Sequence, residues 1–227
     1  MINKIVQSMA DAMAGIKDGS TVLVSGFGSV GQPNALIDGL IEQGAKDLVV
    51  AANNAGSGHV GLARLMELGR VRKIICSFPR SSDPVVFETL YRAGKIELEI
   101  VPQGTLAERI RAAGAGVPAF FTATGVGTKM AVGKEHREID GRTYILEDAL
   151  KGDVGLIEAW EADRWGNLTY KLAGRNFNPI VAMASELSIV QTQHVRDLGD
   201  IHADSIHTPG MFVDRVLHLP YGDPGGF

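Results

Sequence analysis

The amide of Gln103 is the side chain whose position most strongly suggests chemistry. The run 96–101 before it alternates apolar and acidic residues, a period of two that predicts a strand. Gly104 permits a sharp turn, and Thr105 with Glu108 three residues later forms a capping box that predicts a helix starting there. Gln103 would then lie at the carboxyl end of a strand, where open α/β sheets bind ligands. An amide there could donate to a developing oxyanion or hold a carboxylate; the alternative is that it satisfies loop backbone.

A glycine-rich turn provides a second candidate for ligand binding. The run Gly26-Phe-Gly28-Ser-Val-Gly31 matches the pattern of dinucleotide-binding turns, directly after the predicted strand 21–24. That pattern also needs an acidic residue at the end of the next strand to hold a ribose, and the neutral Asn53 and Asn54 stand there instead. Phe27 inside the turn would crowd a pyrophosphate. A CoA phosphopantetheine arm or an acyl thioester could still approach the glycines and the helix N–H groups that follow. The remaining alternative is a tight turn without a ligand.

The other reactive side chains favour structural roles. Cys76 follows two isoleucines in a predicted strand, which is typical of a small buried residue, and no base for a nucleophilic thiol is evident. The six histidines are scattered without the spacing of metal ligands, so no metal site is predicted. Arg175 and Asn176 could reach an active site, but a turn held by the asparagine amide is the preferred interpretation.

The composition excludes several classes of protein. The 227 residues suffice for one large α/β domain, and 45% hydrophobic with 21% charged residues is ordinary for a globular protein. A net charge of −4 with interspersed charges predicts no nucleic-acid partner and no membrane partner. No apolar run approaches the about 20 residues that span a bilayer, and the first residues do not form a signal sequence. The single cysteine fits a reducing compartment, so we expect a cytoplasmic protein.

Helices and strands alternate along the first half of the chain. This alternation predicts an α/β fold with an open, mostly parallel sheet and helices on both faces. Beyond residue 112 the rhythm changes, and 138–146 predicts a hairpin around an Asp140-Gly141 turn within a small β-rich insertion. We expect one domain, 1–221, and a flexible C-terminal tail, 222–227. The predicted helices are 2–16, 33–41, 60–68, 83–91 and one after Thr105; the predicted strands are 21–24, 48–52, 73–77, 96–101, 153–160, 167–170, 187–191 and 212–219.

Several segments, taken in order, resemble the class I 3-oxoacid CoA-transferases. The glycine turn lies in the first of them, Asp18–Pro33. The resemblance covers nearly the whole chain, and the length fits the α subunit. Within the family, 77–80 and 91–99 look most like the α subunits of 3-oxoadipate CoA-transferases, whereas Glu158 stands where related subunits usually carry lysine. The other matching segments are 53–56, 102–110, 115–121, 175–178 and 206–210.

The resemblance implies a CoA-transferase-like fold and a ping-pong reaction. CoA would move from an acyl-CoA, succinyl-CoA in the first instance, to a 3-oxoacid, with 3-oxoadipate favoured and acetoacetate next. The nucleophile would be a glutamate of a separate β subunit, within a Glu-Asn-Gly or Glu-Ser-Gly tripeptide that this chain lacks. The implied assembly is α2β2. Coenzyme A would be a substrate, and no cofactor is expected.

The resemblance also implies roles for named residues. Gln103, with Asn53 and Asn54, would position the substrate and stabilise oxyanions near the partner's glutamate. Arg80 could bind the distal carboxylate of a dicarboxylic oxoacid such as 3-oxoadipate, because a guanidinium pairs with a carboxylate through two hydrogen bonds; the alternative is a solvated loop arginine. The turn that would receive CoA or the acyl group consists of Ser25, Gly26, Phe27, Gly28, Ser29, Val30 and Gly31.

Three other functions stay open at this point. A sugar-phosphate isomerase or deaminase could use the same kind of sheet, but it would require a general base within this chain. A non-catalytic module that binds acyl-CoA would need no reactive group at all. A dehydrogenase that binds NAD is the least supported, because the acidic ribose ligand is missing.

Overall fold

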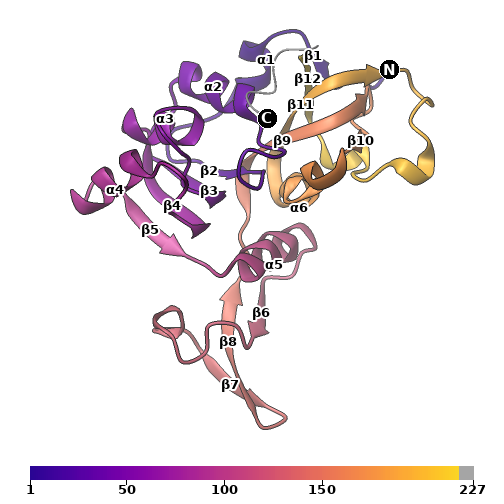
Figure 1. The fold of residues 1–227 in the computed structure, drawn as a ribbon. Coiled ribbons are helices and arrows are strands. Elements are labelled where there is room, and N and C mark those ends of the chain that lie inside the picture. The colour runs from indigo at the N-terminus through magenta and orange to yellow at the C-terminus, as the bar shows by residue number, and fades with distance from the viewer. Residues whose placement is uncertain (220–227) are drawn as a thin grey trace.

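The protein is built around one large sheet whose strand order departs from the order of the chain. In the computed structural model, which describes residues 1–219, the strands follow the order β1-β12-β11-β9-β2-β3-β4-β5, and β10 pairs with β9 (Figure 1). Every strand pair of this sheet is parallel except β10 with β9. The bounds are β1 (Ile5–Val6), β2 (Thr21–Val24), β3 (Leu48–Asn54), β4 (Val71–Phe78), β5 (Glu97–Ile100), β9 (Gly152–Asp163), β10 (Leu168–Thr169), β11 (Ser185–Arg196) and β12 (Arg215–His218).

Helices cover both faces of this sheet, as predicted. Alternate residues of β2 divide between two apolar clusters: Val22 and Val24 face one, whereas Leu23 faces the other. The first cluster is completed by α1 (Met9–Met13), α2 (Asn34–Gln43), α3 (Gly61–Glu67) and α4 (Val85–Arg92), and the second by α5 (Gln103–Gly114) and α6 (Asn178–Ala184). Because both faces are buried, the strands can be apolar throughout. None of the helices in residues 1–219 is long and apolar enough to cross a membrane.

A small antiparallel sheet extends away from the main body beyond α5 (Figure 1). It consists of β6 (Ala119–Thr122), β8 (Arg142–Asp148) and β7 (His136–Ile139), in that spatial order. Asp140 and Gly141 both have positive φ, +51° and +73°, which is the geometry that joins two strands by a two-residue turn. The predicted hairpin and β-rich insertion are therefore confirmed.

The predicted first helix, 2–16, is wrong in its first half. Ile5 and Val6 form β1 and pair in parallel with Val216 and Leu217 of β12, so a partner more than two hundred residues away decides their conformation. The helix begins only after Ser8, whose hydroxyl accepts a hydrogen bond from the N–H of Asp11 at 3.1 Å. The other predicted strands and helices are present, with ends that shift by a few residues. The predicted boundary at 221 and the tail 222–227 lie outside the described residues.

The predicted capping box is also wrong. Helix α5 begins at Gln103 itself, two residues earlier than Thr105, and no side chain caps it. Pro102 is the residue before the helix, with φ of −52° and an extended ψ of 136°, and Gly104 lies inside the first turn rather than in a sharp loop. Thr105 is only 4% exposed and packs beneath the helix instead of capping it. Gln103 therefore projects from a rigid first turn.

Candidate functional site

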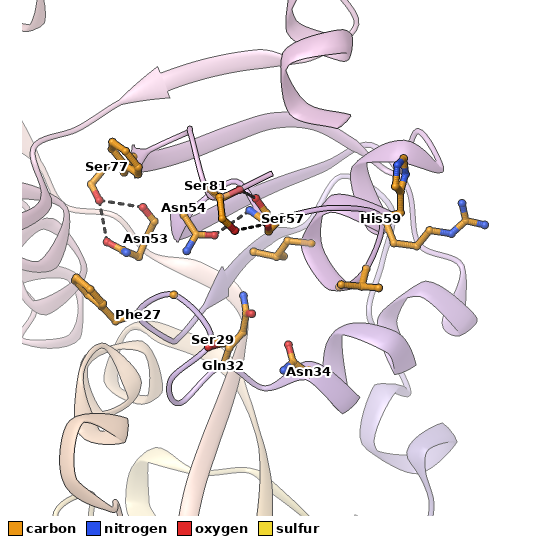
Figure 2. A pocket seen from close by; sticks show the side chains of 18 of the residues that line it. Phe27, Ser29, Gln32, Asn34, Asn53, Asn54, Ser57, His59, Ser77 and Ser81 are labelled. Carbon is orange, nitrogen blue, oxygen red and sulfur yellow. Dashed lines mark hydrogen bonds between the residues drawn. The ribbon is translucent and has the colours of Figure 1, made fainter. Parts of the chain in front are cut away.

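A cavity of about 1190 Å³ lies at the carboxyl ends of β2, β3 and β4 (Figure 2). Its lining includes Phe27, Gly28 and Ser29 from the glycine turn, Asn53 and Asn54 from the end of β3, and Gln103 from α5. The structure therefore brings the three predicted amides and the tip of the predicted turn into one space. This position, outside the carboxyl ends of parallel strands, is the usual ligand site of open α/β sheets.

The amides are joined by a short hydrogen-bond network. The Oδ1 atom of Asn53 accepts from Gln103 Nε2 at 2.6 Å and from the hydroxyl of Ser77 at 2.8 Å, and this hydroxyl shares its proton with the backbone carbonyl of Asn53 at 2.9 Å. Ser77 lies near the end of β4 next to Asn53 on β3, and Asn53 is only 8% exposed (Figure 2). Both donors meet at one oxygen, which fixes the orientation of the Asn53 amide. The Nδ2 group of Asn53 and the second N–H of Gln103 have no acceptor among the described residues, so they can donate to a ligand.

Asn54 shapes the loop that follows β3. Its Oδ1 atom accepts from the N–H of Gly56 at 2.9 Å, which closes a tight turn. Gly56 has φ of +77°, and a Cβ atom there would lie 2.5 Å from the backbone nitrogen of Ala63. Only glycine fits, and the loop is held close to α3.

Serine hydroxyls bind this loop to the loop after β4. Ser57 and Ser82 are hydrogen-bonded through their hydroxyls at 3.0 Å, and the hydroxyl of Ser81 donates to the carbonyl of Gly56 (Figure 2). The N–H of Asp83 donates to Ser57 Oγ at 3.1 Å. These three serines line the cavity, yet their hydroxyls are used to hold its wall together.

The glycine turn is a two-residue hairpin with Gly28 and Ser29 at its tip. The N–H of Phe27 donates to the carbonyl of Val30 at 3.0 Å, and the N–H of Val30 donates back at 3.2 Å. Phe27 is 52% exposed and lines the cavity, so the turn presents an aromatic side chain as well as backbone. Ser25, by contrast, is 2% exposed and donates to the carbonyl of Leu156 at 2.9 Å.

Two asparagines in the segment after β10, Asn176 and Asn178, hold the glycine turn by hydrogen bonds. We call them the asparagine clamp. Asn176 accepts from the N–H of Gly26 at 3.2 Å and donates to the carbonyl of Val30 at 3.0 Å. Asn178 donates to the carbonyl of Gly31 at 3.0 Å. The preferred structural interpretation of Asn176 is confirmed. Of the predicted binding turn, Ser25, Gly26, Val30 and Gly31 are not among the cavity lining.

Arg80 does not lie in the cavity. Its side chain is 72% exposed, and its Nε atom donates to Glu88 of α4 at 3.0 Å. The cavity lining includes Ser81 and Ser82 next to it in the chain but not Arg80 itself.

Several lining residues were not predicted from the sequence. Ser77 could have been found, because it lies near the end of β4 as Asn53 lies near the end of β3. His59, in the loop before α3, and Arg64, in the last turn of α3, line the cavity and carry no spacing signal. Asp38 of α2 is the one carboxylate among the described residues of the lining, and burial, together with the neighbouring Glu42, raises its pKa.

Cys76 has a structural environment rather than a catalytic one. Cys76 is fully buried, and this burial raises the pKa of its thiol to about 12, so it stays protonated near neutral pH. The predicted role as a small buried residue is confirmed. Within residues 1–219 no group of three or more His, Cys, Asp or Glu side chains is arranged to hold a metal ion.

A second carboxyl group with a shifted pKa lies beside the asparagine clamp rather than in the cavity lining. Burial raises the pKa of Glu158 on β9 to about 7, although a hydrogen bond from Gln191 at 3.2 Å opposes the shift. Gln191 in turn accepts from the N–H of Leu36 in the first turn of α2 at 3.1 Å. The backbone N–H of Glu158 donates to Asn178 at 2.8 Å, so this carboxyl is connected to the support of the glycine turn.

Comparison with known proteins identifies close relatives over nearly the full length. The chain is 59% identical over 217 residues to one subunit of the 3-oxoadipate CoA-transferase of Pseudomonas putida, covering 96% of this chain and 94% of that protein. It is 52% identical to the subunit of the same name from Acinetobacter baylyi, with 96% and 95% covered. One subunit of a probable succinyl-CoA:3-ketoacid coenzyme A transferase from Bacillus subtilis is 45% identical, with 95% and 90% covered.

Solved structures share the fold at lower identity. The acyl-CoA transferase YdiF from Escherichia coli O157:H7 superimposes with a TM-score of 0.84 at 22% identity, and the chain covers 47% of it, about half its length. Glutaconate coenzyme A-transferase from Acidaminococcus fermentans gives the same TM-score and identity, with 76% of that chain covered. The decarboxylase AibA/AibB has a TM-score of 0.81 at 23% identity, so this fold alone does not determine the reaction. The sequence model of the coenzyme A transferase family, however, matches residues 6–219, and the chain belongs to that family.

Proposed function

We propose that this chain is the α subunit of a heteromeric CoA-transferase that moves CoA from an acyl-CoA to a 3-oxoacid. Succinyl-CoA is the proposed donor, and 3-oxoadipate, ahead of acetoacetate, is the proposed acceptor. The observation that carries the proposal is a cavity with unpaired amide donors on Asn53 and Gln103 but no glutamate among the described residues of its lining. The relatives, each named as one subunit of a transferase, support a second, partner subunit.

In the proposed reaction a glutamate of the partner attacks the thioester carbon of the acyl-CoA. The C–S bond breaks, CoA leaves as the thiolate, and an acyl–glutamyl anhydride remains. The thiolate then attacks the glutamyl carbonyl, releases the donor carboxylate and leaves a glutamyl-CoA thioester. The acceptor acid reverses these steps and departs as the new acyl-CoA. Dividing the transfer into such steps is covalent catalysis.

This chain contributes the surroundings of the reacting carbonyl. Each step passes through a tetrahedral oxyanion, and fixed N–H donors in a site with little water stabilise such an oxyanion strongly. Asn53 Nδ2 and Gln103 Nε2 are the proposed donors, and Ser77 positions Asn53. Asn54 stays a proposed contact to the substrate, and the turn tip at Phe27, Gly28 and Ser29 is the proposed seat of the acyl or pantetheine group.

The remaining parts of the proposal concern assembly and location. We propose an α2β2 heterotetramer in the cytoplasm, with coenzyme A as a substrate and no cofactor. Membership of the CoA-transferase family favours this function over a sugar-phosphate isomerase or a non-catalytic binding module.

The decisive experiment measures CoA exchange between succinyl-CoA and 3-oxoadipate. We expect the isolated chain to transfer nothing, and addition of a β subunit of the same family to restore exchange. Trapping with hydroxylamine or borohydride during turnover should modify only a carboxylate of the partner.

The control for this experiment is Asp38→Asn, which removes the carboxylate of the cavity lining. We expect the paired Asp38→Asn enzyme to keep its activity within about threefold, since a group outside the reaction costs little when its charge is removed. Exchange by the isolated chain, or a trapped label on Asp38, would contradict the proposed division of labour.

A further inference from the structure

The cavity has a basic end as well as an amide end. His59, in the loop before α3, and Arg64, in the last turn of α3, line it, and Figure 2 shows His59 on the side away from Asn53 and Phe27. They are the basic side chains among the described residues of the lining. We call His59 and Arg64 the basic end, and Asn53, Ser77 and Gln103 the amide end.

One carboxylate outside the cavity lining orients both basic side chains. Arg64 Nη1 donates to Glu67 Oε2 at 2.6 Å, and His59 Nδ1 donates to the other oxygen of Glu67 at 2.9 Å. These hydrogen bonds lower the pKa of Glu67, the bond from Arg64 most of all, so Glu67 stays an anionic anchor. The Nε and Nη2 groups of Arg64 have no acceptor in the described part of the chain, which leaves them available for a ligand.

Stability alone does not explain this arrangement. The side chains of Arg64 and His59 are 48% and 63% exposed, and ion pairs with such access to water contribute little to folding. The pair is better explained by what it presents to the cavity, since an arginine fixed by one partner loses less freedom when it binds a second anion.

The other groups near this end are already used or lie elsewhere. The hydroxyls of Ser57, Ser81 and Ser82 hold the two loops together. Arg80, the candidate from the sequence, is paired with Glu88 outside the cavity. Among the described residues of the lining, Arg64 is therefore the arginine with N–H groups left for an anionic group of a substrate.

We propose that Arg64, with His59 beside it, binds the carboxylate of a dicarboxylic acyl substrate that is remote from the thioester. This inference rests on the proposed function and adds its substrate specificity: the reacting carbonyl lies at the amide end, and the distal carboxylate lies at the basic end. A guanidinium suits this role because it can donate two parallel hydrogen bonds to one carboxylate.

The test compares two acceptors in the paired enzyme, 3-oxoadipate and acetoacetate, which differ in the distal carboxylate. For Arg64→Gln we expect the ratio of kcat/KM for 3-oxoadipate to that for acetoacetate to fall by about tenfold to hundredfold, the range for hydrogen bonds to a charged group. Arg64→Lys should recover part of the ratio, since lysine keeps the positive charge but cannot donate two parallel hydrogen bonds to one carboxylate. An unchanged ratio would overturn the inference.

Arg111→Gln is a matched control. Arg111 is paired with Glu108 at the same spacing along a helix, its side chain is 47% exposed, and it lies outside the cavity lining. It should leave the ratio unchanged. Arg80→Gln, tested in parallel, decides between the two arginines: a fall of the ratio with Arg80→Gln but not with Arg64→Gln would assign the carboxylate to Arg80 and overturn our inference.

A second arm separates the acyl carboxylate from the phosphates of CoA, which are anions too. The paired wild type and Arg64→Gln are compared with succinyl-CoA and succinyl-3′-dephospho-CoA. Loss of the preference for the 3′-phosphate in Arg64→Gln, with the acid ratio unchanged, would assign Arg64 to CoA instead. A wild-type pair that transfers CoA to no oxoacid would overturn the proposed function together with this inference, whereas an active pair with an unchanged ratio overturns the inference alone.

Discussion

The two ends of the cavity are built differently. At the amide end, Asn53 is 8% exposed, and the exposed Gln103 and the partly buried Ser77 converge from different elements on one of its oxygens. At the basic end, Arg64 and His59 are about half exposed and share one carboxylate on their own segment. Fixed dipoles are most useful where charge develops during a reaction, because they need no rearrangement at that moment. Exposed charged side chains suit substrate recognition, because they can bind a charged group that one substrate carries and another lacks. Under the proposed function, the amide end carries out the chemistry and the basic end selects the substrate.

Removal of Gln103 is the most severe test of this comparison. In the paired enzyme we expect Gln103→Ala to lower kcat by about 10²- to 10³-fold, the usual cost of one oxyanion donor, with a small change in KM. Steady-state kinetics with succinyl-CoA and 3-oxoadipate measures it. Gln7→Ala, an exposed glutamine outside the cavity, is the control.

The 2.6 Å contact between Gln103 and Asn53 allows a sharper version. If the two amides act as one unit, the double variant with Asn53→Ala should lose much less than the product of the two single losses. Strictly multiplicative losses, or a Gln103→Ala enzyme whose kcat stays near wild type, would show that the amide end does not work as a connected donor pair.

The sequence pointed to part of the amide end. Short apolar runs predicted β2, β3 and β4, and Asn53 and Gln103 were each expected at the carboxyl end of a strand. Their shared role came from the resemblance to the CoA-transferase family, and Ser77 was not predicted. The exact position of Gln103 was not predicted. Helix α5 begins at Gln103, two residues earlier than the capping pattern of Thr105 and Glu108 suggested. Likewise, Ile5 and Val6 carry a helix-like pattern but follow a strand partner more than two hundred residues away.

The basic end could not have been predicted in the same way. Arg64 lies on α3 and His59 in the loop before it, where charged residues are common and mostly solvated. Their relation to the cavity depends on the turn at Gly56, which brings the loop close to α3. The role of the segment 175–178 as a clamp under the glycine turn is equally invisible in the sequence, because the contacts join residues about 150 positions apart.

The asparagine clamp gives the next largest prediction. Asn178 is fully buried and makes hydrogen bonds to the carbonyls of Gly31 and Gly174 and from the N–H of Glu158. Asn178→Ala leaves these groups buried without partners, and we expect the free energy of unfolding to fall by about 3 kcal/mol. Urea unfolding of the chain measures it.

Asn3→Ala is the control for the clamp, because Asn3 is exposed and accepts one local hydrogen bond from the N–H of Ile5. It should change stability by less than about 0.5 kcal/mol. If Asn178→Ala is as mild as Asn3→Ala, the position of the glycine turn does not depend on the clamp.

The smallest prediction compares two carboxyl groups, Glu67 at the basic end and Glu158 beside the clamp. Burial raises the pKa of Glu158 from 4.5 to about 7, whereas hydrogen bonds from Arg64 and His59 lower the pKa of Glu67. Between pH 4.5 and 7 the folded chain holds the Glu158 proton and the unfolded chain does not, so this group's contribution to stability falls as the pH rises through that window and is constant above it.

Glu158→Gln should remove this dependence, because a neutral amide can still accept from Gln191. We expect the variant to be more stable than wild type at pH 8 by about 2 kcal/mol and to match it at pH 4.5, where the wild-type carboxyl is protonated in the folded state. Urea unfolding at the two pH values measures the difference, and Glu97→Gln at an exposed site serves as the control. If the stability of Glu158→Gln follows the wild-type pH profile, water reaches the Glu158 carboxyl group freely. The region beneath the glycine turn would then be as open to water as the basic end.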